Sequence, residues 1–516
     1  MKLSKLSKIV LFPFFAGVFS IPSIFSLLRQ GFFTSDDGGW MIIRFAAFYS
    51  SFSDGQFPVR FLKGLNFGYG YPVANFLYPG FMYMATPFHF LGFGFVDSVK
   101  IVLMLSFIFS SVFTFLWLRT LFGKLPSLIG SVLFVYTPYH LYDLYKRGSV
   151  GEIVSLTFVP LVLYGVEKRN YYVISISIFL LIVSHNSMAL LFLPVIVSYI
   201  LIRYFLDKKI FFGVGTGIAL SSFFIVPAVF ELGYTYFKKT TISNPSEYFV
   251  GLEMIGIISI LLLLASLVIF KMGRKNNNVS HNGLFVLFIS VSFISMFLSA
   301  FLSEVIWKTP IASLLQFPFR VLSLLLLTNA FFAAYVLNFL KGIRRYVVFI
   351  LLLIISLYSS FKFMKPAEFT NIPDSVYATN PATTTVKNEY MPMWVKEFPT
   401  SQYEHKVELL NGKGEVENVI EKSNRISFDL NNSTSTKIRL NTVYYPGWRA
   451  YVDNNEVSIH YENPKGVMDI PIAEGQKNIR FVFSETPLRI LADGVSVIAV
   501  VLLIAYSFRK VYKFKK

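Results

Sequence analysis

Two adjacent carboxylates, Asp36 and Asp37, stand in the stretch FFTSDDGGW, between a long apolar run and an aromatic one. A carboxylate beside a membrane-spanning segment is costly, and its presence there indicates a functional site. Such a group can take a proton from a reacting hydroxyl as a general base. The structural alternative is that Ser35 or Asp36 caps a helix that begins near Gly39, where negative charge also complements the helix dipole. Both interpretations can hold together, and they leave open which aspartate reacts.

Other ionisable side chains occur near the ends of apolar segments on the same predicted side of the membrane. They come from separate stretches of chain and are Arg44, Arg60, Asp143, Arg147, Glu152, His185, Glu231 and Arg320. Polar groups that converge at the rim of a helix bundle favour a binding cavity there. Cations and imidazole suit a phosphate, so Arg147, His185 and Arg320 are the predicted phosphate-binding residues.

Each of these residues also has a structural interpretation. The charged residues of YDLYKRGSVGE (142–152) could form surface ion pairs of little energetic value. His185 could be a satisfied helix-end residue, and Arg320 could simply extend its charged head to the interface. In GLNFGYGYP, Tyr69 and Tyr71 could pack against a sugar, although such residues are also common in loops. The predicted substrate-binding residues are Arg44, Arg60, Tyr69, Tyr71, Asp143 and Glu152.

Several other chemistries are excluded or disfavoured by composition. The chain has no cysteine, so disulfides, thiolate metal sites and cysteine nucleophiles are excluded. The six histidines are scattered without zinc-type spacing, and no spacing specific to any metal is present, although this many carboxylates could hold Mg²⁺ or Mn²⁺. The net charge of +18 resides mostly at helix ends on one side, which does not indicate nucleic-acid binding.

The elements that must position these residues are membrane helices. Of the 516 residues, 54% are hydrophobic and 15% are charged, and the mean hydropathy is +0.58. Much of the chain must therefore contact lipid. Apolar runs of about 20 residues indicate spans. Hydropathy predicts about twelve, near 9–29, 98–118, 126–141, 151–166, 171–184, 187–205, 210–231, 250–270, 284–302, 318–340, 344–361 and 488–508.

The distribution of Lys and Arg predicts the orientation of these spans. With the N-terminus inside, every inner loop is basic, as the positive-inside rule requires. These loops are LRTLFGK, EKRN, RYFLDKK, KMGRKNNN, KGIRR and the tail SFRKVYKFKK, so both termini are predicted to be cytoplasmic in a multi-pass cell-membrane protein. The apolar stretch 75–95, broken by Pro79 and Pro87, is interpreted as interfacial, because counting it as a span would invert the later basic loops. Residues 31–97 then form a long outer loop with surface helices near 40–53 and 77–92.

The region 363–487 turns polar and predicts a β-rich extracytoplasmic domain. Alternating runs such as RISFDL, TKIRLNTVYY and NIRFVF read as strands separated by turns. Tyr445 to Trp448 reads as a turn into a strand, Asp453 to Asn455 as a hairpin turn, and Trp448 as a core residue in preference to a sugar platform. The chain then divides into a membrane domain at 1–362, this β-rich domain, and a last span with a basic tail at 488–516.

Several motifs together resemble a known family. SDDGGW, DGQFPVRFLKGLNFGYGYPVANFLYPG, YTPYHLYDLYKRGSVGE, SHNSMALLFLP, LQFPFR and YYPGWRAYVDNNEV resemble the bacterial YfhO-like membrane proteins, a group that includes chains labelled membrane protein 6-pyruvoyl-tetrahydropterin synthase-related. The pterin label does not fit, because a pterin synthase binds zinc through clustered histidines. More distantly, the chain resembles the GT-C superfamily of glycosyltransferases that use lipid-linked sugars.

The GT-C resemblance implies a fold and a site. It implies a GT-C-like polytopic membrane protein whose first outer loop carries juxtamembrane helices, with an acidic residue just after the first span and polar residues from the second outer loop. Asp36 or Asp37 matches the first position, and Asp143 lies in the second loop. Relatives carry His-Asp where this chain has Ser35-Asp36-Asp37, which keeps the identity of the working aspartate open.

The expected function is transfer of a hexosyl or pentosyl group on the extracytoplasmic face. The donor would be a polyprenyl-phosphate sugar and the acceptor a glycan, lipid or protein of the cell envelope, with the bilayer as the other partner. Asp36 or Asp37 would be the base. Two alternatives belong to other classes: a flippase or transporter of lipid-linked saccharides, which needs charges along a path through the membrane, and a non-catalytic envelope assembly protein.

Overall fold

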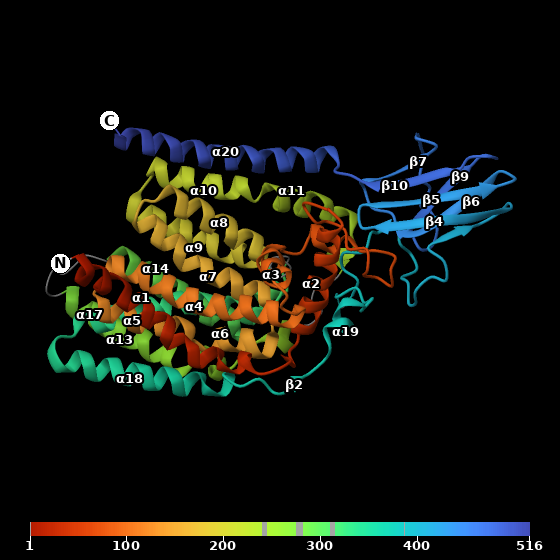
Figure 1. Ribbon diagram of the computed structural model, residues 1–516. Coiled ribbons are helices and arrows are strands. Elements are labelled where there is room, and N and C mark those ends of the chain that lie inside the picture. The colour runs from red at the N-terminus through yellow and green to blue at the C-terminus, as the bar shows by residue number, and fades with distance from the viewer. Residues whose placement is uncertain (1, 240–244, 275–281, 310–314, 386, 516) are drawn as a thin grey trace.

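The computed structural model describes residues 2–239, 245–274, 282–309, 315–385 and 387–515. A bundle of long helices forms one part of the molecule, and a β-sandwich extends from one end of the bundle (Figure 1). The last helix, α20 (Pro487–Lys515), returns from the sandwich along the bundle. The structure thus confirms a helical membrane domain with a β-sheet domain ahead of the last helix.

Every predicted span contains a helix. They are α1 (Lys2–Ile24), α4 (Phe95–Leu121), α5 (Lys124–Val135) with α6 (Pro138–Tyr142), α7 (Val150–Glu167), α8 (Tyr171–Ser184), α9 (Asn186–Tyr204), α10 (Lys208–Leu220) with α11 (Ser222–Phe230), α12 (Leu252–Ile255) with α13 (Ile257–Arg274), α14 (Asn282–Ser299), α17 (Leu324–Phe339), α18 (Gly342–Ser360) and α20. Within the described residues, eight helices are long and apolar enough to cross a membrane, or nine if the bent pair α10 and α11 is one span. The multi-pass architecture is confirmed, and the count of twelve stays a prediction.

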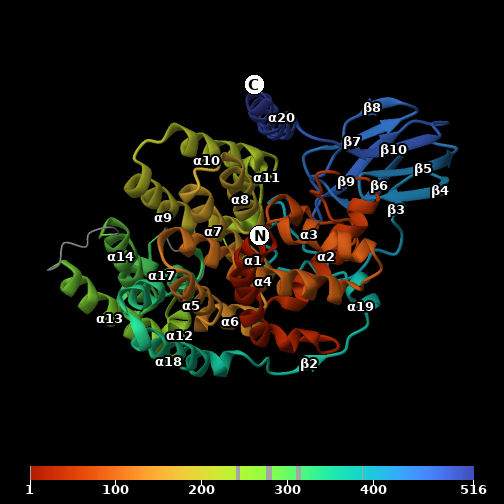
Figure 2. The same cartoon turned by 60° about the vertical axis from the view of Figure 1, so that its left-hand side comes forward.

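The break between α10 and α11 bends the chain by 64°. Ser496 of α20 stabilises this break, because its Oγ accepts a hydrogen bond from Phe223 N at 2.9 Å and donates one to Ala219 O at 3.2 Å. Backbone groups freed inside a membrane need such partners. Helix α20 accordingly packs on α10 and α11, on the opposite side of the bundle from α18 (Figure 2).

The two ends of the bundle differ. The start of α1 and the end of α20 lie together at the end away from the sandwich (Figure 1). The junction of α17 and α18, which contains Lys341, lies at that same end (Figure 1). Among the predicted inner loops, Lys275 to Asn278 and Lys516 lie outside the described residues. Assignment of this end to the cytoplasm stays a prediction.

The first outer loop carries the two expected helices, α2 (Gly38–Ser53) and α3 (Gly80–Phe90). Both lie between the bundle and the sandwich (Figure 2), and α3 packs on α4. Pro79 occupies the N-cap position of α3, and the helix has only 11 residues. That length is too short to cross a membrane. The interfacial interpretation of this apolar stretch therefore agrees with the helix length.

The β-domain is a sandwich of two antiparallel sheets. Its strands are β3 (Val407–Leu409), β4 (Gly414–Lys422), β5 (Arg425–Asn432), β6 (Thr436–Val443), β7 (Trp448–Val452), β8 (Asn455–Val457), β9 (Val467–Ile472) and β10 (Asn478–Phe483). One sheet has the order β4-β5-β10-β7-β8 and the other β3-β6-β9. Asp453 and Asn454, both at positive φ, make the predicted hairpin turn between β7 and β8. Trp448 is 4% exposed and packs on Phe61 and Phe483, so its core position is confirmed.

Residues 363–406 precede the sandwich and pack along the first outer loop. Strand β2 (Phe369–Thr370) pairs with β1 (Phe32–Phe33), just before the two aspartates. Asp374 accepts hydrogen bonds from the first amides of α4, and Tyr71 Oη bonds Thr385 Oγ1 at 3.0 Å. The regular strands of the sandwich therefore begin well after the polar composition does, because this segment is a tether bound to the loop.

Candidate active site

Asp36 and Asp37 are fixed by backbone hydrogen bonds to the second outer loop. Asp36 N donates to Lys146 O at 2.9 Å, and Asp37 N donates to Arg147 O at 2.7 Å. Those carbonyls belong to the single π-helical turn η3 (Asp143–Arg147) between α6 and α7. Two loops that are far apart in sequence are thereby held in register.

Gly148 allows this close approach. It adopts φ +65°, a left-handed conformation, and terminates the π-helical turn. This conformation disfavours residues other than glycine. A Cβ atom at this position would collide with Ser35 Oγ and would lie 2.9 Å from Gly38 N. Glycine is therefore required here by both backbone conformation and space.

The side chains of Asp36 and Asp37 have different partners. Ser35 Oγ accepts the hydrogen bond of Gly38 N at 3.2 Å, whereas Asp37, at the N-cap position of α2, makes no capping bond with its side chain. Asp36 pairs with Lys146 at 3.2 Å, and both side chains are at least half exposed. Asp37 instead reaches Arg147 Nη2 at 3.4 Å. The aspartate that joins the buried charge cluster is therefore Asp37.

The charge cluster beneath Asp37 is nearly sealed from solvent. Arg147 Nη1 contacts Asp143 Oδ1 at 2.9 Å and Glu152 Oε1 at 2.5 Å. Arg320, on η8 (Pro318–Ser323), contacts the same Glu152 oxygen through Nε at 2.9 Å and Nη2 at 2.8 Å. The Asp143 and Glu152 side chains are 0% exposed and the two arginines 5% or less. These are buried pairs, so the alternative of surface ion pairs does not apply to Arg147.

His185 borders the cluster as a neutral group. It lies at the junction of α8 and α9, where its Nδ1 accepts a hydrogen bond from Met188 N at 3.3 Å and caps α9. Its Nε2 is 3.9 Å from Glu152 Oε1. Burial lowers the pKa of His185 to about 3, against the opposing effect of Glu152. The helix-end interpretation therefore describes its geometry, and at neutral pH it offers an imidazole and no cationic charge.

A surface cavity of about 440 Å³ opens above this cluster. Asp36, Asp37, Arg147 and Glu247 form its polar lining. Its other walls are largely aromatic and apolar: Tyr142, Tyr248, Phe249, Val250, Met254, Phe317 and Phe319. The stacked rings of Phe317 and Phe319 also lie against the Arg147 guanidinium, with ring centres 5.5 and 5.0 Å from Cζ. One carboxylate and one guanidinium from the cluster thus face a cavity of a size that holds a small ligand.

Asp37 has a perturbed acidity. Its side chain is 40% exposed toward the cavity. The surrounding protein nevertheless raises the pKa of Asp37 above its ordinary value by desolvation. The charges of Arg147, Arg44 and Arg320 act in the opposite direction. A raised pKa moves the Asp37 carboxyl toward the acidity that suits a general base.

None of the six predicted substrate-binding residues is part of the cavity lining, and three of them are Arg44, Tyr69 and Tyr71 of the first outer loop. Arg44 is 3% exposed and donates to Thr384 O at 2.9 Å, while its charge still reaches Asp37. Tyr71 Oη accepts from Tyr390 N at 3.0 Å, and Tyr69 Oη accepts from Lys465 Nζ at 3.2 Å. All three connect the first outer loop to the tether or the sandwich.

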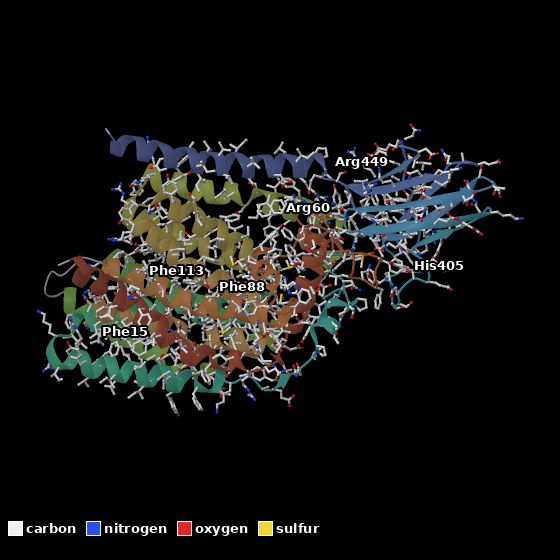
Figure 3. All side chains as sticks on the ribbon, viewed as in Figure 1. Phe15, Arg60, Phe88, Phe113, His405 and Arg449 are labelled. Carbon is white, nitrogen blue, oxygen red and sulfur yellow. The ribbon has the colours of Figure 1, made fainter. Side chains whose placement is uncertain are left out.

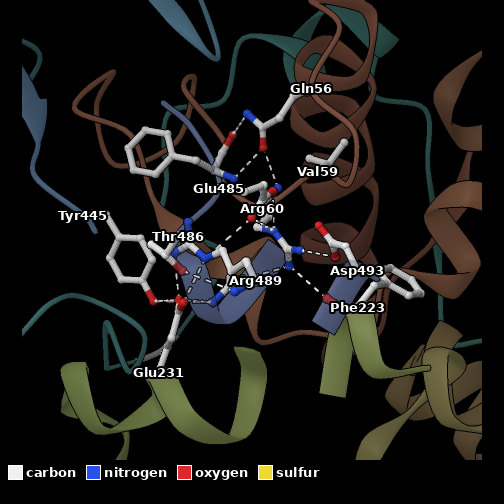
Figure 4. Close-up of polar contacts among 12 residues, drawn as sticks. Gln56, Val59, Arg60, Phe223, Glu231, Tyr445, Glu485, Thr486, Arg489 and Asp493 are labelled. Carbon is white, nitrogen blue, oxygen red and sulfur yellow. Dashed lines mark hydrogen bonds and ion pairs between the residues drawn. The ribbon is translucent and has the colours of Figure 1, made fainter. Parts of the chain in front are cut away.

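Arg60 lies in a second charge cluster, at the junction of the bundle and the sandwich (Figure 3). Its guanidinium pairs with Glu485 at 2.7 Å and Asp493 at 2.8 Å. Close by, Glu231 accepts bidentate hydrogen bonds from Arg489 at 2.9 and 2.7 Å (Figure 4). Asn75 lies within hydrogen-bond distance of both Arg60 and Glu231. We call the residues Arg60, Asn75, Glu231, Tyr445, Glu485, Arg489 and Asp493 the interdomain lock. A substrate-binding role for Arg44, Arg60, Tyr69 and Tyr71 stays a prediction.

The described residues contain no group of three or more His, Cys, Asp or Glu side chains arranged to hold a metal ion. In the cavity itself, Asp36, Asp37 and Glu247 supply carboxylate oxygens. Such oxygens could contribute to binding a divalent cation together with a ligand phosphate. Participation of Mg²⁺ or Mn²⁺ stays a prediction.

Sequence reasoning missed the aromatic walls and Glu247. Phe317 and Phe319 precede Arg320 in LQFPFR, and Tyr142 precedes Asp143 in YDLYKR, so aromatic neighbours of charged rim residues were the available signal. Glu247 and Tyr248 had no comparable signal, since they occur in a polar connection between helices.

Comparison with known proteins gives limited similarity. No family's sequence model matches the chain, and no curated protein matches it by sequence. Two similar solved structures are an arabinofuranosyltransferase and an oligosaccharyltransferase. The mycobacterial arabinofuranosyltransferase AftD has a TM-score of 0.45 and 18% identity over 69% of this chain and 27% of that chain. The oligosaccharyltransferase of Archaeoglobus fulgidus has a TM-score of 0.42 and 11% identity over 74% of this chain and 56% of that chain.

The chain therefore spans about a quarter and about half of these two proteins. With TM-scores below 0.5, their activities are not transferred to it. Membership in the YfhO-like family stays a prediction. The features established for this chain are a multi-pass helical membrane domain, a β-sandwich ahead of the last helix, and a charged cavity at the end of the bundle that carries the sandwich.

Proposed function

We propose that this chain is a membrane glycosyltransferase that transfers a sugar from a polyprenyl-phosphate donor to an envelope acceptor on the extracytoplasmic face. The observation that carries the proposal is that Asp37 and Arg147, a base with raised pKa and a buried guanidinium, line one cavity. A lipid-linked donor keeps its chain in the bilayer, so base and phosphate-binding group must meet at the membrane rim. The cavity lies at the ends of α1, α6 and η8, where that rim would be.

The proposed step uses the two groups in distinct roles. The Asp37 carboxylate takes the proton of the acceptor hydroxyl while the acceptor oxygen bonds to the anomeric carbon of the sugar. The bond from that carbon to the phosphate oxygen breaks, and the leaving polyprenyl phosphate retains the electron pair. Arg147 Nη2 stabilises the phosphate by a charge-assisted hydrogen bond. The aromatic walls, Tyr142 and Tyr248 among them, give the sugar ring apolar surfaces to pack against.

The test is transfer by the purified full chain in proteoliposomes. Polyprenyl monophosphates carrying radiolabelled hexosyl or pentosyl groups are supplied together with an extract of envelope glycans and lipids, with Mg²⁺, with Mn²⁺ or with EDTA. We expect label to move to an acceptor with release of polyprenyl phosphate. Absence of transfer from every donor under all three conditions would contradict the proposal.

The same vesicles distinguish the transporter alternative. A flippase would move the labelled donor between leaflets without breaking the sugar–phosphate bond. In the described part of the chain, Asp37, Asp143, Arg147, Glu152 and Arg320 gather at one rim. This placement favours transfer over transport, which needs charges along a path through the membrane. Donor translocation without cleavage would support the transporter instead.

A further inference from the structure

Glu152 lies beneath the cavity and does not line it. Its side chain is 0% exposed, although sequence reasoning placed it among the substrate-binding residues. It sits in the first turn of α7, a helix that is 78% buried inside the protein. A ligand in the cavity therefore meets Arg147 before it could meet Glu152.

One oxygen of Glu152 binds both arginines of the cluster. Oε1 accepts from Arg147 Nη1 at 2.5 Å and from Arg320 Nε and Nη2 at 2.9 and 2.8 Å. The other oxygen accepts from Tyr139 Oη at 3.1 Å. The Glu152 carboxylate thus connects η3, η8 and α6 through charge-assisted hydrogen bonds, which are stronger than hydrogen bonds between neutral groups.

These contacts determine which part of Arg147 faces the cavity. Nη1 is occupied from beneath by Glu152 and Asp143, and the stacked rings of Phe317 and Phe319 lie against the guanidinium. Nη2 points toward Asp37, at the longer distance of 3.4 Å. An incoming anion can compete for Nη2 without breaking the bonds at Nη1.

We propose that Glu152 is a positioning residue, which orients the Arg147 guanidinium so that Nη2 presents its hydrogens to the phosphate of the ligand. This inference rests on the proposed function, because the ligand phosphate is that of the polyprenyl-phosphate donor. Glu152 touches neither the ligand nor the reacting atoms. Its effect reaches the donor only through Arg147.

Two variants separate positioning from folding. Glu152→Gln keeps the shape of the side chain and removes its charge, which leaves the buried Arg320 guanidinium without its carboxylate partner, whereas Arg147 keeps Asp143 and Asp37. Glu152→Gln combined with Arg320→Gln removes one charge of each sign and restores the charge balance. We expect the double variant to recover most of the thermal stability lost by the single one. We do not expect it to recover donor binding, because Arg147 Nη1 keeps its contact with Asp143 but still lacks the one with Glu152.

The measurement is the affinity of the purified full chain in detergent for undecaprenyl phosphate, by native mass spectrometry, together with Tm. A misplacement of a functional group by about 1 Å can lower the rate of an enzyme reaction on the order of 10²-fold. We accordingly expect both variants to bind at least tenfold more weakly than wild type. Ser155→Ala, a change one turn further along α7 at an equally buried position, is the matched control and should bind within about threefold of wild type.

The outcomes are distinct. If the double variant folds and binds like wild type, Glu152 does not position Arg147, and the inference is wrong while the proposed function stands. If wild type itself does not bind undecaprenyl phosphate, the proposed function is contradicted and the inference with it. Glu152→Asp keeps the charge but shortens the side chain by one methylene, so weakened binding in this variant supports positioning even where Gln variants fail to fold. Wild-type binding by Glu152→Asp would count against it.

Discussion

Replacing Glu231 by Gln is expected to open the interdomain lock. Glu231 is 2% exposed and accepts hydrogen bonds from Arg489, from Tyr445 Oη at 2.8 Å and from Asn75 Nδ2 at 2.8 Å. These donors come from the last helix, the sandwich and the first outer loop. One carboxylate thus joins three parts of the chain to the end of α11.

The size of the effect follows from the burial of Arg489. Its side chain is 0% exposed, and after removal of the Glu231 charge the nearest remaining carboxylate in the described residues, Glu485, is 4.0 Å away and already paired with Arg60. Breaking a buried ion pair by removing one partner costs about 3–5 kcal/mol. At about 1.4 kcal/mol per tenfold change, the equilibrium constant for opening should rise on the order of 10²- to 10³-fold.

The absence of cysteine from the chain gives a direct assay. Thr442 is 2% exposed on β6, in the seam where the sandwich meets Gly68 and Gly70 of the outer loop. In a Thr442→Cys background, thiol labelling requires the seam to open, so its rate should rise with the opening constant. The matched control is Glu253→Gln, which removes an exposed ion pair with Lys362. Such pairs contribute at most about 1 kcal/mol, so this control should change the rate less than about fivefold.

A labelling rate in Glu231→Gln within about fivefold of its parent would refute the reasoning. So would an equal acceleration by Glu253→Gln. Either result would mean that the sandwich is held by its apolar contacts, such as Phe61 on Trp448, and not by the buried charges.

Two further predictions concern the cavity. Gly148→Ala should displace the loop that carries Asp37, since the new Cβ would collide with Ser35 Oγ. We expect the rate of sugar transfer to fall at least tenfold. The rate of thiol labelling in the Thr442→Cys background should stay unchanged. For pH dependence, a base must be deprotonated, and burial raises the pKa of Asp37. The acidic limb of the transfer rate should therefore lie above the ordinary carboxyl range of about 4. Arg147→Met removes the largest opposing charge, so the midpoint of the residual rate should move to higher pH; a move to lower pH would contradict this.

The membrane helices were predictable from the sequence because lipid imposes a simple requirement. Each apolar run between basic loops contains a helix, and the short α3 was recognisable from Pro79 at its N-cap, Pro87 within it and its effect on loop orientation. The bend between α10 and α11 was not predictable, because it depends on Ser496 from a helix at the far end of the sequence. The position at which the sandwich begins, well after residue 363, was not predictable either, because residues 363–406 are held by contacts with the first outer loop.

The sequence predicted which charged residues lie near the rim, but it did not predict that they form two separate clusters. Sequence reasoning placed them all at one rim, whereas the fold divides them between the Asp37 cluster and the interdomain lock. The lock includes Glu485, Arg489 and Asp493, which no motif distinguished from ordinary residues at the start of a span. Asp36 and Asp37 are adjacent in sequence, and only the docking of their backbone on η3 directs one outward and the other toward Arg147.

The measurement that tests the central proposal most directly is the transfer rate of Asp37→Asn beside that of Asp36→Asn. Asparagine keeps the side-chain shape and removes the base, and a general base contributes about 10²- to 10⁴-fold to rate. The account predicts a loss of that size for Asp37→Asn at saturating donor, with unchanged membrane insertion. Asp36→Asn and the control Asp97→Asn, an exposed carboxylate paired with Lys100 at the start of α4, should stay within about threefold of wild type. Full activity of Asp37→Asn would contradict the account.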